Sequence, residues 1–142
     1  MDTTILRKRI GVWFVIHFIV DCITAIPLFI VPVLFLSWLG WVDVDPVAAR
    51  LVAAALFGIG IESLLGRKST LHSFITMLNL KIIWSAAAVI GLGLSLIQNA
   101  QGNPVAVWAI FIIFIAFHGL WVYWRVKAGQ ALKDNKADVK AE

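Results

Sequence analysis

The sequence predicts an all-α integral membrane protein, built as a four-helix bundle in a single domain over residues 1–142. Three observations predict this fold class. Hydrophobic residues make up 61% of the chain and charged residues only 14%, whereas soluble domains carry about 25% charged residues. The mean hydropathy is +0.93. Four apolar segments each reach the length of about 20 residues that a helix needs to cross a bilayer.

The first expected span is longer than a bilayer requires. It contains Pro27 and Pro32, and a proline inside a helix removes a backbone hydrogen bond and clashes with the preceding turn. We therefore expect this span to bend at the two prolines. The four spans cover approximately residues 10–39, 46–65, 71–97 and 104–124.

The second and fourth spans each follow a typical helix start. Asp45 precedes Pro46, and Asn103 precedes Pro104. Asp and Asn are favoured N-cap residues because their side chains accept hydrogen bonds from the first free N–H groups of a helix. Proline is favoured at the next position, where its missing N–H is not needed. Both dipeptides therefore indicate that a helix begins there.

Lysine and arginine are distributed unevenly between the two sides of these spans. One side holds only Arg50, together with Asp43 and Asp45, and its 98–104 loop has no charge. Cytoplasmic segments carry an excess of basic residues. We therefore predict that the protein lies in the inner membrane with both termini on the cytoplasmic side. Residues 125–142 would form a cytoplasmic tail, which we expect to be a frayed helix end. The basic residues of that side are Arg7, Lys8, Arg9, Arg67, Lys68, Arg125, Lys127, Lys133, Lys136 and Lys140.

Several polar side chains lie inside the apolar spans, in the half nearer the cytoplasm. Ionisable groups in a span cost several kcal/mol, so they normally face protein or water and have partners. His17 and Asp21 share one helical face, and we expect Asp21 to pair with Lys81, which lies at a similar depth. The full predicted cluster is His17, Asp21, Glu62, Asn79, Lys81 and His118.

Each of three members has an alternative interpretation. Lys81 is interfacial if the third span begins later in the sequence. Glu62 is close enough to the membrane surface to pair with Arg67 or Lys68. His118, which is surrounded by aromatic residues, is a neutral histidine with its hydrogen bonds satisfied and is not a ligand.

Small residues recur every four positions on the second and third spans. In lipid, such faces let helix backbones approach closely. We expect these two spans to pack as a tight antiparallel hairpin, or to make the same contact between two protomers. The residues are Ala54 and Gly58 on the second span and Ala87, Gly91 and Ser95 on the third.

Residues 27–66, "PLFIVPVLFLSWLGWVDVDPVAARLVAAALFGIGIESLLG", follow a recurrent pattern. A proline-punctuated first span leads to a turn that contains an aspartate, and then to a small-residue helix. The segment resembles small uncharacterised prokaryotic four-helix membrane proteins of the DoxX-like kind. The resemblance implies the same four-span fold and transfers no catalytic residue.

The sequence favours a non-catalytic membrane protein, either an accessory subunit or a small oligomeric scaffold. It has no HExxH motif, no Gly-rich phosphate loop and no Ser/His/Asp set in its loops. The expected partners are the lipid bilayer and either further copies or a larger membrane complex. Because the basic residues flank apolar segments instead of forming a patch, nucleic acid is not an expected partner. No cofactor is expected either.

Two alternative functions remain open. One is a small proton-coupled transporter that uses Asp21, Glu62 and Lys81. The other is an electron-transfer subunit that binds haem b or a quinone, with His17 and His118 as the candidate ligands.

Overall fold

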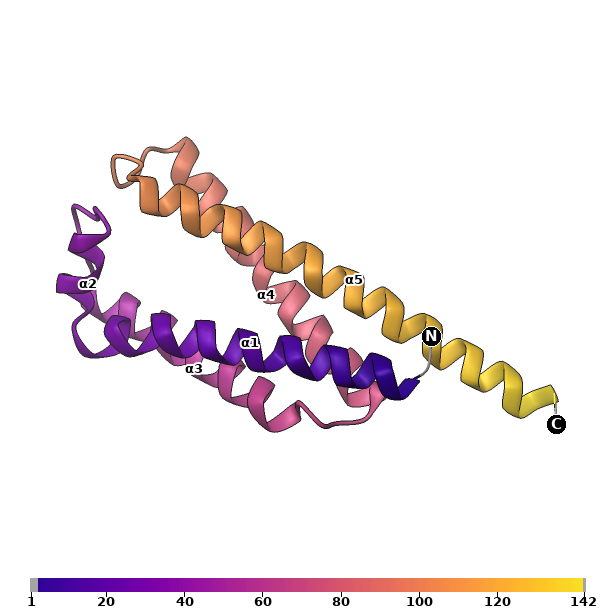
Figure 1. The fold of residues 1–142 in the computed structure, drawn as a ribbon. Coiled ribbons are helices and arrows are strands. Elements are labelled where there is room, and N and C mark those ends of the chain that lie inside the picture. The colour runs from indigo at the N-terminus through magenta and orange to yellow at the C-terminus, as the bar shows by residue number, and fades with distance from the viewer. Residues whose placement is uncertain (1–2, 142) are drawn as a thin grey trace.

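The computed structural model describes the backbone of residues 3–141 and the side chains of residues 3–135. Over this range the chain is all-helical and contains no strand, which confirms the predicted secondary-structure class (Figure 1). Four of its helices are long and apolar enough to cross a membrane. The five helices are α1 (Thr3–Ile30), α2 (Pro32–Trp38), α3 (Pro46–Gly66), α4 (Leu71–Ile97) and α5 (Val105–Ala141).

The helices form two pairs. α1 packs along α3, and α4 packs along α5, whereas contacts between the pairs are few. Figure 1 shows the two pairs meeting near the N-terminus and separating toward the end that carries α2. The expected hairpin of the second and third spans is therefore wrong within one chain. Ala54, Gly58, Ala87 and Gly91 are all exposed, and Ser95 is half-buried.

Two apolar clusters hold these pairs. The larger cluster joins the early turns of α1 to the first half of α4 and the second half of α5, so it links the pairs to each other. The smaller cluster lies between the late turns of α1 and the early turns of α3. Buried members of the larger cluster include Leu6, Ile10, Phe14, Leu71, Phe74, Leu78, Trp121, Trp124 and Ala128.

The first predicted span is divided into two helices. α1 continues through Pro27 as far as Ile30, and α2 begins at Pro32. Val31 lies between them with φ −130° and ψ 55°, which is outside the helical region. A residue that precedes proline is disfavoured in the helical region by the proline ring. Pro32 therefore accounts for the interruption.

The helix boundaries differ from the prediction at both ends of the chain. α1 already includes the basic residues Arg7 to Arg9, which were expected before it. α5 has 37 residues and is about 55 Å long at 1.5 Å per residue. The segment expected as a frayed tail is thus a continuation of α5 as far as Ala141, and residue 142 lies outside the described residues.

The predicted cap of the second span is present, but that of the fourth is not. Asp45 Oδ1 accepts hydrogen bonds from the N–H groups of Val47, at 2.8 Å, and Ala48, at 3.3 Å. Asn103 instead has a positive φ of 49°. Its side-chain nitrogen donates to the carbonyl of Leu96 at 2.8 Å. Asn103 therefore satisfies the end of α4 instead of the start of α5.

The α2–α3 and α4–α5 loops are joined by one side chain. Gln101 Oε1 accepts hydrogen bonds from the N–H groups of Val42, at 3.0 Å, and Asp43, at 3.2 Å. Its Nε2 donates to the carbonyl of Asp43 at 3.1 Å. Gly40 lies so close to Pro104 that an added Cβ would come within 2.7 Å of the proline Cβ. The two helix pairs are therefore also connected at this end.

Candidate functional site

Four polar side chains meet inside the bundle, and we call them the buried polar cluster. His17 and Asp21 come from α1, Ser63 from α3 and Lys81 from α4. Their exposed fractions are 9%, 4%, 0% and 2% in that order. The alternative interpretation of Lys81 as an interfacial residue is therefore not supported. The cluster links both helix pairs, because α4 belongs to the second pair.

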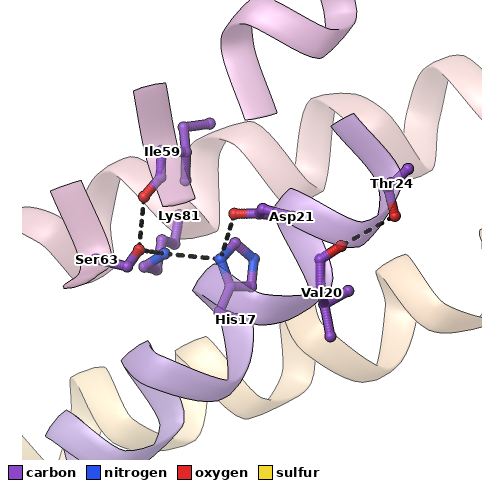
Figure 2. Close-up of polar contacts among 7 residues, drawn as sticks. All are labelled: His17, Val20, Asp21, Thr24, Ile59, Ser63 and Lys81. Atoms are coloured by element: carbon purple, nitrogen blue, oxygen red, sulfur yellow. Dashed lines mark hydrogen bonds and ion pairs between the residues drawn. The ribbon is translucent and has the colours of Figure 1, made fainter. Parts of the chain in front are cut away.

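His17 lies at the centre of the cluster (Figure 2). Its Nδ1 is 2.8 Å from Asp21 Oδ2 and 3.1 Å from Lys81 Nζ. Lys81 Nζ is also 2.6 Å from Ser63 Oγ. Among residues 3–135, no nitrogen–oxygen distance of 4 Å or less joins Lys81 directly to Asp21. The direct pair expected from the sequence is thus replaced by a chain of contacts that runs through His17.

Ser63 acts as an acceptor for Lys81. The Ser63 hydroxyl donates its hydrogen to the carbonyl of Ile59 at 2.6 Å, one turn earlier on α3. A hydroxyl has one hydrogen and two lone pairs, so the oxygen remains free to accept from Lys81. The direction of this hydrogen bond is therefore fixed by the local backbone.

His17 Nδ1 serves two neighbours that make different demands. A protonated Nδ1 donates to the Asp21 carboxylate, whereas an unprotonated Nδ1 accepts from the Lys81 amine. One ring nitrogen cannot satisfy both contacts at once. In the structure the contact with Lys81 is a hydrogen bond, and Asp21 Oδ2 accepts none within residues 3–135. A hydrogen placed on Nδ1 would instead be shared with the Asp21 carboxylate.

Aromatic rings surround the polar atoms of the cluster. Lys81 Nζ lies 5.0 Å from the ring centroids of both Phe14 and Trp121. The His17 ring packs edge to face against Phe117 at 5.1 Å and Trp121 at 5.0 Å. A cation at this distance from an aromatic face is attracted by it. α5 therefore contributes to the cluster through its rings.

Gly60 allows α3 to approach Asp21 closely. An added Cβ at Gly60 would come within 2.9 Å of the Asp21 Cβ and 3.1 Å of Oδ2. A real side chain at that position would force one of the two helices to shift. Gly60 thus determines how near α3 lies to the buried carboxylate.

The other predicted members of the cluster lie elsewhere. Glu62 is exposed on α3. Asn79 is also exposed, and its Oδ1 accepts a hydrogen bond of 2.7 Å from Arg125. His118 Nδ1 is 2.9 Å from Ser85 Oγ, one turn beyond Lys81 on α4. The structure therefore brings together His17, Asp21 and Lys81 from the predicted set and adds Ser63.

Sequence reasoning missed Ser63 for a physical reason. A serine in an apolar helix commonly bonds to the carbonyl four residues earlier, as Ser63 does, and such a residue needs no further partner. The available signal was its spacing from Gly60, which places both on one helical face. The same face carries Ala49 and Ala53, which are buried against α1.

The two candidate haem ligands have other contacts. His17 Nδ1 contacts Asp21 and Lys81, and His118 Nδ1 contacts Ser85. Within the described residues, no group of three or more His, Cys, Asp or Glu side chains is arranged to hold a metal ion. The haem or quinone function stays a prediction, which the visible absorbance of purified protein would test.

The length and apolar composition of the four long helices fit a multi-pass membrane protein. The side chains on the outside of the helices are largely Ile, Val and Leu, as a lipid environment requires. No family model matches the chain, and neither a curated protein nor a solved structure is significantly similar to it. The DoxX-like resemblance of residues 27–66 stays a prediction.

Proposed function

We propose that this chain is a non-catalytic scaffold of the cytoplasmic membrane that works as a homo-oligomer. In this proposal the buried polar cluster is a structural joint between the two helix pairs. Each of its charged groups has a partner inside the same chain: Asp21 contacts His17, and Lys81 contacts His17 and Ser63. Buried polar contacts between helices favour one packing, because separating the helices would leave charged groups without neighbours. Within residues 3–135, Asp21 Oδ2 lies near His17 but accepts no hydrogen bond.

The observation that carries this proposal is the outward-facing stripe on α3. Ala54, Gly58 and Glu62 follow one another at four-residue spacing and are all exposed. Nothing lies within 4 Å of a Cβ built on Gly58. An ionisable group within a span normally faces protein or water, yet within residues 3–135 the Glu62 carboxylate has no ion pair. A second copy packed on this stripe would supply both the close contact and the polar neighbour.

The orientation in the membrane is part of the proposal. The N-terminus, the α3–α4 loop and the end of α5 carry the basic residues, so we place these parts on the cytoplasmic side. The loops joined by Gln101 then face outward. The interruption at Val31 supports a bend in the first span, which this orientation would put in the half of the bilayer away from the cytoplasm.

Size measurement of the detergent-purified protein tests the assembly. Light scattering behind a sizing column should give the mass of an oligomer for the unchanged chain and of a single chain for Gly58→Leu. Gly119→Leu is the matched control, because Gly119 on α5 is also exposed and has open space around its added Cβ. A monomeric mass for the unchanged chain, in several detergents and after crosslinking in membranes, would contradict the scaffold.

One observation favours a second function, a proton-coupled carrier. His17 Nδ1 lies within hydrogen-bond distance of both a carboxylate and an amine, so the cluster can hold one hydrogen in either of two places. The set that supports this function is Asp21, His17 and Lys81, and the exposed Glu62 is not part of it. Proton uptake by vesicles that contain the protein should then exceed that of empty vesicles and be lost in Asp21→Asn. Glu62→Gln should retain it, and uptake equal to that of empty vesicles would rule the carrier out.

A further inference from the structure

A groove with a basic rim lies beside the early turns of α1. Its volume is about 500 Å³. One wall is α1, and the other is the end of α3 with the turn that follows. The basic side chains that line it are Arg7 and Lys8 on α1, Arg67 and Lys68 on the turn. We call it the basic groove.

The four basic side chains lack acidic neighbours within the part of the chain that the structure describes. The ion pair formed there at 4 Å or less is that of His17 with Asp21, inside the bundle. Lys8 and Lys68 are exposed, and their amines donate no hydrogen bond to residues 3–135. The groove is therefore a concentration of positive charge that an anion can neutralise.

Two contacts hold the walls of the groove together. Arg7 Nε donates to the carbonyl of Ser69 at 3.1 Å, and Arg7 Nη2 donates to the carbonyl of Lys68 at 3.3 Å. Gly11 is buried, and a Cβ added to it would collide with the carbonyl oxygen of Arg67. The close approach at Gly11 brings basic residues about 60 positions apart in the sequence to one site.

The floor of the groove is apolar and continues along α1 into the span. Val12, Val15 and Ile16 line it, and Val12 and Ile16 are 53% and 38% exposed. Ile16 lies about 12 Å along the helix axis from Lys8. A ligand that follows the groove therefore meets positive charge first and hydrocarbon next.

We propose that the basic groove binds an anionic phospholipid, with the phosphate at the four cations and an acyl chain along the apolar floor. Basic pockets at the cytoplasmic ends of membrane helices suit such headgroups, and a free phosphate would leave the apolar floor unused. This inference rests on the orientation given under the proposed function, because it requires the groove to open at the headgroup level of the cytoplasmic leaflet.

Native mass spectrometry of the full chain in detergent tests the proposal. The added lipids are dioleoyl phosphatidylglycerol and, as the neutral comparison, dioleoyl phosphatidylcholine. We expect one tightly bound phosphatidylglycerol per chain. The double variant Lys8→Gln/Lys68→Gln should weaken its binding about 25-fold, because each basic side chain near an anionic surface contributes roughly fivefold.

The matched control removes two positive charges from α5. Lys127→Gln/Lys133→Gln should keep the affinity for phosphatidylglycerol within about twofold, because neither residue lines the groove. Equal binding of the two lipids, or equal weakening by both double variants, would overturn the proposal. Displacement of the lipid by millimolar inorganic phosphate would also overturn it and would assign the groove to a free anion.

The same spectra separate this inference from the proposed assembly. They report the number of chains and the number of bound lipids independently. A monomeric chain that still binds phosphatidylglycerol at the groove would contradict the homo-oligomeric scaffold and support the lipid site. An oligomer that binds both lipids equally would support the scaffold and contradict the lipid site.

Discussion

Lys81 Nζ lies 2.6 Å from Ser63 Oγ, and this hydrogen bond ties α4 to α3 inside the bundle. Ser63 donates its own hydrogen to the carbonyl of Ile59, and its oxygen accepts the hydrogen bond that Lys81 donates. Loss of the hydroxyl leaves a buried ammonium with one fewer acceptor. Beyond the larger apolar cluster, this hydrogen bond is one of the polar contacts that join the two helix pairs inside the bundle.

Ser63→Ala should therefore lower the free energy of unfolding by about 1–3 kcal/mol, the cost of an unsatisfied buried donor. The measurement is the thermal unfolding midpoint in detergent. Ser95→Ala is the matched control, because the Ser95 hydroxyl also bonds to the carbonyl four residues earlier, at 3.0 Å, but has no buried cation beside it. An equal shift in the two variants would show that the contact with Lys81 contributes nothing.

Lys81→Met and Asp21→Asn should be destabilising alone and less so together. Each single change leaves the opposite charge buried without compensation, which can cost about 3–5 kcal/mol, whereas the double change removes both charges. The folded yield from a fluorescence-detected sizing column measures this. Strictly additive losses would show that Asp21 and Lys81 do not interact through His17. As a control, Asn79→Ala should have little effect, because its contact with Arg125 is exposed.

Gly60→Ala and Gly119→Ala should act in opposite directions. The new methyl at position 60 would press on Asp21, and overpacking of this kind costs about 1–3 kcal/mol. The methyl at position 119 has open space on α5, outside the stripe that the proposed oligomer covers, and Ala favours a helix over Gly by up to about 1 kcal/mol. Unfolding midpoints of the two variants decide the matter. A stabilising Gly60→Ala would mean that α3 does not approach Asp21 so closely.

Cysteine labelling tests the proposed orientation. Cys22 is the chain's single cysteine, so a Cys22→Ser background allows new cysteines to be placed at Gly102 and Lys133. A membrane-impermeant thiol reagent added to intact cells should label Gly102→Cys, and it should label Lys133→Cys only after the cells are opened. The reverse pattern would overturn the orientation and, with it, the cytoplasmic placement of the basic groove.

The sequence predicted where the spans lie better than it predicted which spans touch. Hydropathy and length define the long helices, because both are properties of one segment. Partner choice is different, since residues that face lipid and residues that face protein are equally apolar. α3 illustrates this, because it has small residues on two faces. Four-residue spacing pointed to Ala54 and Gly58 as the packed face, whereas Ala53 and Gly60 are the buried residues.

The buried polar cluster was partly predictable for a similar reason. His17, Asp21 and Lys81 are conspicuous because charge inside a span needs a partner. Asp21 and Lys81 lie at similar depth along their spans, but depth does not reveal that the His17 ring lies between them. Glu62 was grouped with them by depth alone, and its helical face turns it outward.

Gln101 joins the two helix pairs at a second place, between the α2–α3 loop and the α4–α5 loop. Its amide holds the α2–α3 loop through three hydrogen bonds, to Val42 and Asp43. The buried polar cluster and the Gln101 amide therefore connect the two helix pairs at two separate places. Rotation of one helix pair against the other about the polar cluster would break the hydrogen bonds of Gln101. Deamidation of Gln101 to a carboxylate, which cannot donate to the Asp43 carbonyl, would remove one of these three hydrogen bonds and so weaken this connection between the two pairs.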